Sequence, residues 1–310
     1  MSTRRRILVI CLVFVLVLTS ALIYSYPVGV YASGDENIGL DNPTFQMGPQ
    51  PTPPLSPKDR KLRAAKLKRF NKWLATQPKI NPKTYDRPLT NNDSLKVSPT
   101  YLRIIEKGVL SVIARKQEKW YYCGPATAQM ILSYDWGMGE RDRYSQKYLA
   151  DYMYTSPSDG TYVYRLRNAL NELKDPYKNP TAYWVYEYLP SDETDAANTL
   201  YSHLKYDITN GPVKQALAFH TNTWPKRGRD VWGKAYGLIG YRSSDGTSGH
   251  STGHYVTGYG YCQYSTGRHT VWYIDSNDSN YGYGNCFGYH EVDTRNMATC
   301  VNGNAHYIIW

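Results

Sequence analysis

The sequence has no Cys-x-x-Cys pair, and such a pair is the most specific sign of a structural zinc site. Its closest histidines, His250 and His254, are separated by Ser-Thr-Gly, which does not continue a helical pattern. Residues 275–280 are rich in oxygen ligands but lack the glycine and the distal glutamate of an EF-hand loop. We therefore expect neither a metal ion nor another cofactor.

Cysteine is scarce, with five residues in a chain of 310, and Cys11 lies in the apolar N-terminal segment. If Cys123 serves chemistry, then Cys262, Cys286 and Cys300 remain, which allows one disulfide and one spare thiol. The spacing does not decide which pair forms. An oxidising exterior is compatible with this cysteine content but is not required by it.

Residues 1–32 contain no acidic residue. Arginines at 4–6, an apolar run over 7–23 and a small-residue site ending at Ala32 predict a signal peptide. We expect a secreted or extracellular protein, or one associated with the cell envelope. An uncleaved anchor is the alternative, because an apolar run of about 17 residues is at the lower limit for a membrane span.

Residues 33–57 are polar and then proline-rich, which is typical of an extended linker. Residues 58–104 begin with many lysines and arginines against an apolar stripe, which predicts a basic amphipathic helix over 58–74 followed by a loop. Three roles are open for this helix: it binds an anionic cell-envelope surface, it covers the active site as a pro-segment, or it docks on the surface of the domain that follows. The net charge of +10 fits an anionic partner, although it also serves solubility. Because the motifs described next lie beyond residue 105, we expect that domain to fold without residues 33–100.

The most informative stretch runs from Gln117 to Leu132. Cys123 is followed by Gly124-Pro125 and then by good helix formers, and proline is favoured in the first turn of a helix. At a helix N-terminus the helix dipole and free N–H groups favour a thiolate, which is a nucleophile. A buried structural cysteine is the alternative. Six positions upstream, Gln117 has a side-chain amide suited to help the Cys123 N–H hold an oxyanion.

Two downstream segments have residues that complete a catalytic set. His254 opens the strand-like run Tyr255-Val256-Thr257, and Asp275 ends another such run. A nucleophile, a base and an orienting acid in the order Cys, His, Asp is the arrangement of a papain-like cysteine hydrolase. His250 is a rival for the base, but only His254 opens an apolar strand.

The pattern Gln-x5-Cys-Gly-Pro-Ala, then Gly-His-Tyr-Val, then a strand ending in Asp, resembles the C39-like branch of the papain-like cysteine peptidases over residues 105–310. The resemblance implies that Cys123 is the nucleophile, His254 the base, Asp275 its orienting residue and Gln117 the oxyanion donor. It implies a thiol hydrolase that cleaves peptide or related amide bonds of a peptide or protein substrate. Together with the signal peptide, this leads us to expect a secreted monomer with no nucleic-acid partner. The alternative is a catalytically inactive C39-like module that binds the cell envelope. No multi-span or nucleotide-binding segment accompanies the domain, so we expect a free-standing member.

Periodicity and turn residues predict an α+β fold, with helices first and an antiparallel sheet afterwards. Expected helices cover 123–136, 144–154, 162–173 and 192–209. Expected strands cover 109–114, 182–188, 212–220, 255–261, 270–274 and 306–310. The resemblance implies the papain-like fold, in which the helix bearing the nucleophile packs on the antiparallel sheet.

Overall fold

The computed structural model describes residues 53–77, 103–177, 181–230, 233–304 and 306–310. The predicted signal peptide, most of the predicted linker and most of the loop after residue 77 lie outside these residues. Within them, no helix combines the length and the apolar character needed to cross a bilayer.

Helices in the described chain begin where the sequence offers caps. Helix α2 (Pro57–Leu74) starts with proline after Ser56, whose hydroxyl accepts the N–H of Asp59. Asp192 caps α7 in the same way. The other helices are α4 (Cys123–Asp135), α5 (Gln146–Tyr152), α6 (Val163–Leu173), α7 (Glu193–Lys205) with its π-helical extension η3 (Tyr206–Asn210), and α8 (Thr294–Asn302).

The strands of the described chain form one seven-stranded antiparallel sheet of order β2-β7-β3-β4-β5-β6, with β1 paired to β4. They are β1 (Ile104–Val109), β2 (Tyr186–Tyr188), β3 (Leu217–Asn222), β4 (Gly253–Tyr264), β5 (His269–Asp275), β6 (Gly288–Asp293) and β7 (Tyr307–Ile309). Strand β4 is the centre of the sheet. Its first half pairs with β3 and its second half with β1, while β5 lies along the other edge.

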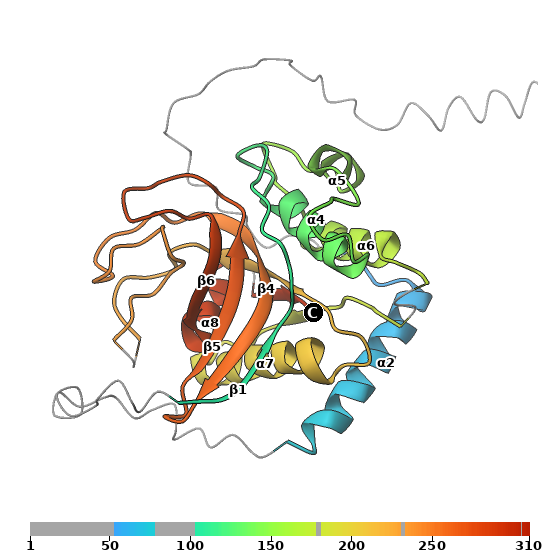
Figure 1. Ribbon diagram of the computed structural model, residues 1–310, viewed down its shortest axis with the longest axis horizontal. Helices are drawn as coiled ribbons and strands as arrows, with labels where there is room; N and C mark the ends of the chain where they lie inside the picture. Colours follow the sequence, from blue (N-terminus) through green and yellow to red (C-terminus); the bar gives the residue numbers. More distant parts are fainter. Residues whose placement is uncertain (1–52, 78–102, 178–180, 231–232, 305) are drawn as a thin grey trace, which may run out of the picture. The chain divides into compact units, whose positions relative to one another are not determined.

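Helices α4, α5 and α6 gather on one side of the sheet (Figure 1). Helix α4 contacts β4, and α7 and α8 pack together against β3 to β5. Almost every residue of α4 is buried, which explains its lack of a polar face. The predicted α+β class, with the Cys123 helix packed on an antiparallel sheet, is confirmed.

Several element boundaries differ from the sequence-based ones. The first strand lies at Ile104–Val109 rather than 109–114, and only the last three residues of the expected strand 182–188 pair in the sheet. Strand β6 and helix α8 were not expected. The sequence before β6 is glycine-rich, which hides a short strand. The first turn of α8 consists of polar residues, Thr294, Arg295 and Asn296, which are typical of a loop in the sequence although they are buried in the structure.

Helix α2 packs into the core rather than resting on it. The ammonium of Lys66, 3% exposed, lies 2.8 Å from Asp207 Oδ2 and 3.0 Å from the carbonyl of Tyr183. The ring of Phe70 lies 5.0 Å from that of Trp310, the last residue of the chain. These buried contacts argue against the expectation that the domain folds without residues 33–100.

Candidate active site

Cys123 is the first residue of α4 and is 8% exposed. Gly124 follows it because there is no room for a side chain: a Cβ at this position would lie 2.3 Å from Thr161 Oγ1. Pro125 fits the first helical turn, where it has no N–H to leave unsatisfied. The sulfur therefore sits at the positive end of a 13-residue helix whose N-cap, Tyr122, supplies no side-chain acceptor.

His254 is the second residue of β4 and is 4% exposed. It pairs with Thr221 of β3, whose hydroxyl donates to the His254 carbonyl at 3.0 Å. The neighbouring Tyr255 donates its hydroxyl to the carbonyl of Thr161 at 2.8 Å. The start of β4 is thus tied to the segment that lies against Gly124.

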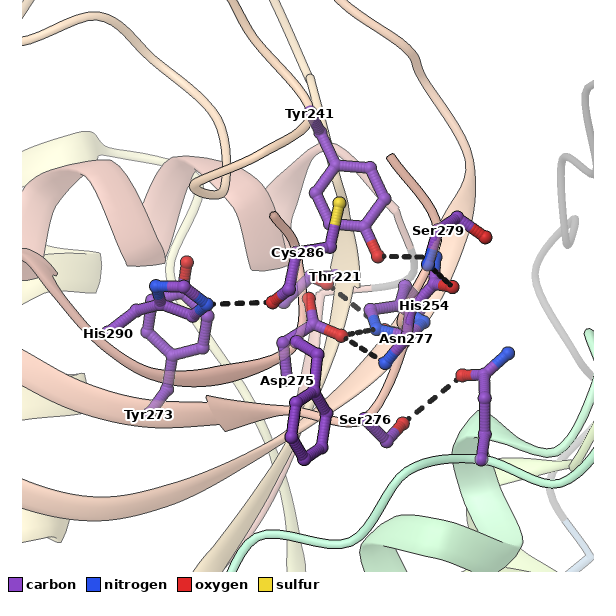
Figure 2. Close-up of polar contacts among 12 residues, drawn as sticks. Thr221, Tyr241, His254, Tyr273, Asp275, Ser276, Asn277, Ser279, Cys286 and His290 are labelled. Carbon is purple, nitrogen blue, oxygen red and sulfur yellow. Dashed lines mark hydrogen bonds and ion pairs between the residues drawn. The ribbon is translucent and has the colours of Figure 1, made fainter. Parts of the chain in front are cut away.

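Asp275 ends β5 and is fully buried. Its Oδ1 lies 2.8 Å from Nε2 of His254 and accepts the backbone N–H of Asn277, also at 2.8 Å (Figure 2). Its Oδ2 is buried and has no hydrogen-bond partner among the described residues. Because Nε2 of His254 is occupied by Asp275, Nδ1 is the ring nitrogen left for the thiol of Cys123.

The electrostatics of this group favour a charged imidazole. Burial alone lowers the pKa of His254, but the charge and hydrogen bond of Asp275, together with the thiol of Cys123, raise it well above the ordinary value. His220, on the adjacent strand, shows the opposite behaviour. It is buried without a carboxylate partner, and burial with the nearby His254 lowers its pKa to about 3. A buried carboxylate is what distinguishes the two histidines.

Gln117 lies beside the strand that ends in Asp275. Its backbone N–H donates to the carbonyl of Ser276 at 2.8 Å, and the Ser276 hydroxyl donates to Gln117 Oε1 at 3.2 Å. Its Nε2 donates to the carbonyl of Trp120 at 2.8 Å. The side-chain amide is therefore oriented by both its oxygen and its nitrogen, and the second hydrogen of Nε2 remains for another acceptor.

His250 lies apart from the buried pair. Its ring stacks on Tyr281 at 4.2 Å, and its backbone, not its ring, bonds with Tyr241 and Thr223. No hydrogen bond between His250 and Asp275 is present in the described chain. The structure thus brings Cys123, His254, Asp275 and Gln117 together and leaves His250 outside.

Two site residues were missed from the sequence. Asn277 binds Asp275 through its N–H and donates its side-chain amide to the hydroxyl of Tyr241 at 2.8 Å. The Tyr241 ring, fully buried, lies 5.8 Å from that of His254 (Figure 2). Asn277 was within reach of a sequence argument, since it follows Asp275 in a turn. Tyr241 was not, because it reaches the site from a loop 34 residues before β5 ends.

Neither metal ligands nor disulfides occur in the described part of the chain. It contains no group of three or more His, Cys, Asp or Glu side chains placed to hold an ion. Its four cysteines, Cys123, Cys262, Cys286 and Cys300, are buried and free.

Comparisons with known proteins place this chain in a family. No curated protein matches the sequence. Similar solved structures include a recombinant stem bromelain precursor, with 12% identity over 82% of this chain and 89% of that one and a TM-score of 0.39. Procathepsin L2 from larval midgut of Tenebrio molitor has 14% identity over 83% of this chain and 94% of that one, with a TM-score of 0.38. These TM-scores are low, and the assignment comes from sequence: the model of the Peptidase_C39 like family matches residues 109–291, more than half of the chain. The chain therefore belongs to the Peptidase_C39 like family, a family of cysteine peptidases.

Proposed function

We propose that the protein is a secreted thiol hydrolase that cleaves peptide or related amide bonds with Cys123, His254, Asp275 and Gln117. The observation that carries the proposal is the 2.8 Å contact between Nε2 of His254 and Oδ1 of a fully buried Asp275. A buried carboxylate beside a histidine stabilises the imidazolium, which is the form needed to keep a neighbouring cysteine as thiolate.

The mechanism has two halves. Cys123 gives its proton to Nδ1 of His254, and the sulfur attacks the carbonyl carbon of the substrate to form a C–S bond. The oxygen, now negative, accepts hydrogen bonds from the Cys123 N–H and the free hydrogen of Gln117 Nε2. His254 then donates its proton to the leaving amine as the C–N bond breaks.

In the second half, water replaces the amine. His254 accepts a proton from the water, the hydroxide adds to the thioester carbon, and the C–S bond breaks to release the acid and the thiolate. Throughout, Asp275 holds the imidazole in one tautomer and orientation.

The inactive binding module is less well supported. A protein that no longer catalysed a reaction would gain nothing from burying a charged pair, since replacing such a pair by apolar residues is often neutral or stabilising.

We further propose a monomer in the extracellular space or cell envelope. The exposed lysines and arginines of α2 would favour an anionic envelope surface over a neutral one.

Alkylation by iodoacetamide tests the thiolate directly. In the purified protein we expect one thiol, Cys123, to react below neutral pH, because burial raises the pKa of the other three described cysteines, Cys262, Cys286 and Cys300. His254→Ala should remove the reactivity below neutral pH and leave only slow labelling at alkaline pH, while His250→Ala should change nothing. Labelling of Cys123 only above pH 8 in the unaltered protein, with no effect of His254→Ala, would favour the binding module.

Cleavage is tested separately with a peptide library read out by mass spectrometry. Products should form with the unaltered protein and disappear with Cys123→Ala. Gln117→Ala removes one oxyanion donor, so its rate should fall by about 100- to 1,000-fold without unfolding.

A further inference from the structure

A cluster of aromatic rings surrounds one arginine near the nucleophile. The guanidinium carbon of Arg165, on α6, lies 4.8, 5.1 and 5.7 Å from the ring centres of Tyr154, Tyr162 and Tyr164. Its Nε donates to the Tyr164 hydroxyl at 3.1 Å, and its Nη1 donates to the carbonyls of Met153 at 3.3 Å and Tyr154 at 3.1 Å. These contacts hold the guanidinium in one place. We call Arg165, Tyr154, Tyr162 and Tyr164 the Arg165 cluster.

Within the described chain, Arg165 has no carboxylate partner. Its contacts are carbonyls, a phenol and ring faces, and Nη2 makes no hydrogen bond to a described residue. Other anchored arginines differ: Arg115 pairs with Asp142 at 2.7 Å and Arg268 with Asp293 at 3.3 Å. A fixed guanidinium with a free N–H edge and no counter-charge is suited to bind an anion.

The cluster follows directly on the segment that packs against the nucleophile's helix. Thr161, against Gly124, immediately precedes Tyr162. Thr155, next to Tyr154, is joined to Thr161 by a hydroxyl–hydroxyl hydrogen bond of 2.7 Å. The two segments that carry the cluster are thus joined at Thr161, the residue that lies against Gly124.

Tyr154 is also held in an unfavourable conformation. Its φ of 51° is in the left-handed region, which a tyrosine rarely adopts, and its side chain is 73% exposed. The bond from Arg165 to its carbonyl helps to keep it there. Such strain persists where surrounding contacts hold it, and it concentrates at binding and catalytic sites.

We propose that the Arg165 cluster is a substrate subsite that takes the carboxylate of an acidic side chain on a peptide. The carboxylate binds the free N–H edge of Arg165, and the exposed Tyr154 ring packs on the aliphatic part of that side chain. This inference rests on the proposed function, since it gives the peptidase a substrate class: peptides with Asp or Glu within a few residues of the scissile bond.

The test compares acidic and neutral substrates in a matched set of variants. Arg165→Gln removes the charge, whereas Arg143→Gln is the control. Arg143 also lies over an aromatic ring, 4.1 Å from Trp136, but at the far end of α4 from Cys123. Peptides that the library assay identifies as substrates are synthesised in pairs. The two members of a pair differ only in carrying Glu or Gln at the acidic position nearest the scissile bond.

The unaltered protein should cleave the Glu peptide about fivefold better in kcat/KM, chiefly through KM, and added salt should reduce that ratio. Arg165→Gln should lose the preference, so that it cleaves the two peptides with equal kcat/KM, while Arg143→Gln should keep the preference. Arg165→Lys, which retains the charge, should retain part of it. The proposal is overturned if the unaltered protein shows no acidic preference, or if Arg165→Gln leaves that preference intact.

Binding separates this proposal from the hydrolase proposal. Fluorescence anisotropy with Cys123→Ala and labelled Glu and Gln peptides measures the subsite without turnover. A Glu preference that disappears on adding Arg165→Gln supports the subsite even if no peptide is cleaved. Equal binding of both peptides rejects the subsite even if the protein proves to be a peptidase.

Discussion

Replacing Asp275 by asparagine removes one charge from the site and little else. Asparagine keeps an oxygen that can accept both the Nε2–H of His254 and the N–H of Asn277, each now 2.8 Å from Oδ1. Without the carboxylate, burial is left as the main influence on His254, and burial lowers its pKa. The imidazolium, and with it the thiolate of Cys123, should become less populated.

The magnitude follows from the hydrogen bond between Asp275 and Nε2 of His254. A hydrogen bond to a charged group contributes about 1.5–3 kcal/mol and a neutral one about 0.5–1.5 kcal/mol, so the change to asparagine removes about 1–1.5 kcal/mol. This corresponds to a rate reduction of about 5- to 13-fold. Asp275→Ala removes the whole bond and should cost about 10- to 150-fold.

The assay is kcat/KM on a peptide that the protein cleaves, measured from pH 5 to 10, because turnover needs the His254 imidazolium as proton donor whereas alkylation needs only the thiolate. Because the pKa of folded His254 is raised, the alkaline limb of the unaltered protein should lie well above pH 6.5. In Asp275→Asn that limb should move to lower pH. For the same reason, the His254 imidazolium contributes to stability below pH 6.5, and this contribution is lost as pH rises through the raised folded pKa. This reasoning would be refuted if the alkaline limb of Asp275→Asn lay at the same pH as that of the unaltered protein. It would also be refuted if Asp275→Asn and Asp275→Ala had equal rates.

Two further predictions concern packing. Gly124→Ala puts a Cβ 2.3 Å from Thr161 Oγ1 and 2.5 Å from its Cβ, so we expect about 1–3 kcal/mol of destabilisation and loss of Cys123 reactivity, partly restored by adding Thr161→Gly. An unimpaired Gly124→Ala would show that the Cys123 helix has freedom to shift. Lys66→Met leaves Asp207 buried without its cation, which should lower the free energy of unfolding by about 3–5 kcal/mol. Lys68 is exposed on the same helix, and Lys68→Met should change the free energy of unfolding by about 0.5 kcal/mol or less. Equal effects of Lys66→Met and Lys68→Met on urea denaturation would mean that α2 is not part of the core.

The sequence was most informative where local signals agreed with tertiary packing. Cys123 before Gly124-Pro125 predicted a helix start, and α4 begins at that residue. The apolar runs that carry His254 and Asp275 predicted strands, and β4 and β5 contain them. In each case the residues that favour the helix or strand locally are also the residues that pack into the core, so the sequence pattern and the structure agree.

The sequence was least informative where a contact joins distant segments. Nothing near Lys66 indicates that it lies in the core, because its partner Asp207 is 141 residues away. A lysine on a basic amphipathic helix is ordinarily exposed, and only the fold shows that this one is not. Tyr241 was missed for the same reason, since its partner Asn277 is 36 residues away.

The orientation of Gln117 depends on the residue that follows the acid. Ser276 accepts the Gln117 N–H through its carbonyl and donates its hydroxyl to the Gln117 amide oxygen. Asp275 and Ser276 are adjacent in the chain, so one short backbone segment positions both Asp275 and Gln117. A displacement of the end of β5 would therefore move both groups together.

Cys123 and His254 are joined in the same manner by their own chain neighbours. Gly124, after Cys123, lies against Thr161, and Tyr255, after His254, donates to the carbonyl of that same threonine. Thr161 is fully buried, so it is a rigid intermediate between α4 and β4. Gly124 and Tyr255 are joined to Cys123 and His254, respectively, each by a planar peptide unit, and both are packed against Thr161. Cys123 and His254 therefore have little freedom to move relative to each other. The distance between the Cys123 sulfur and the His254 imidazole is therefore set by the packing of Gly124 and Tyr255 on Thr161, and not by contacts of the two side chains themselves. Such packing keeps a site ordered before substrate binds.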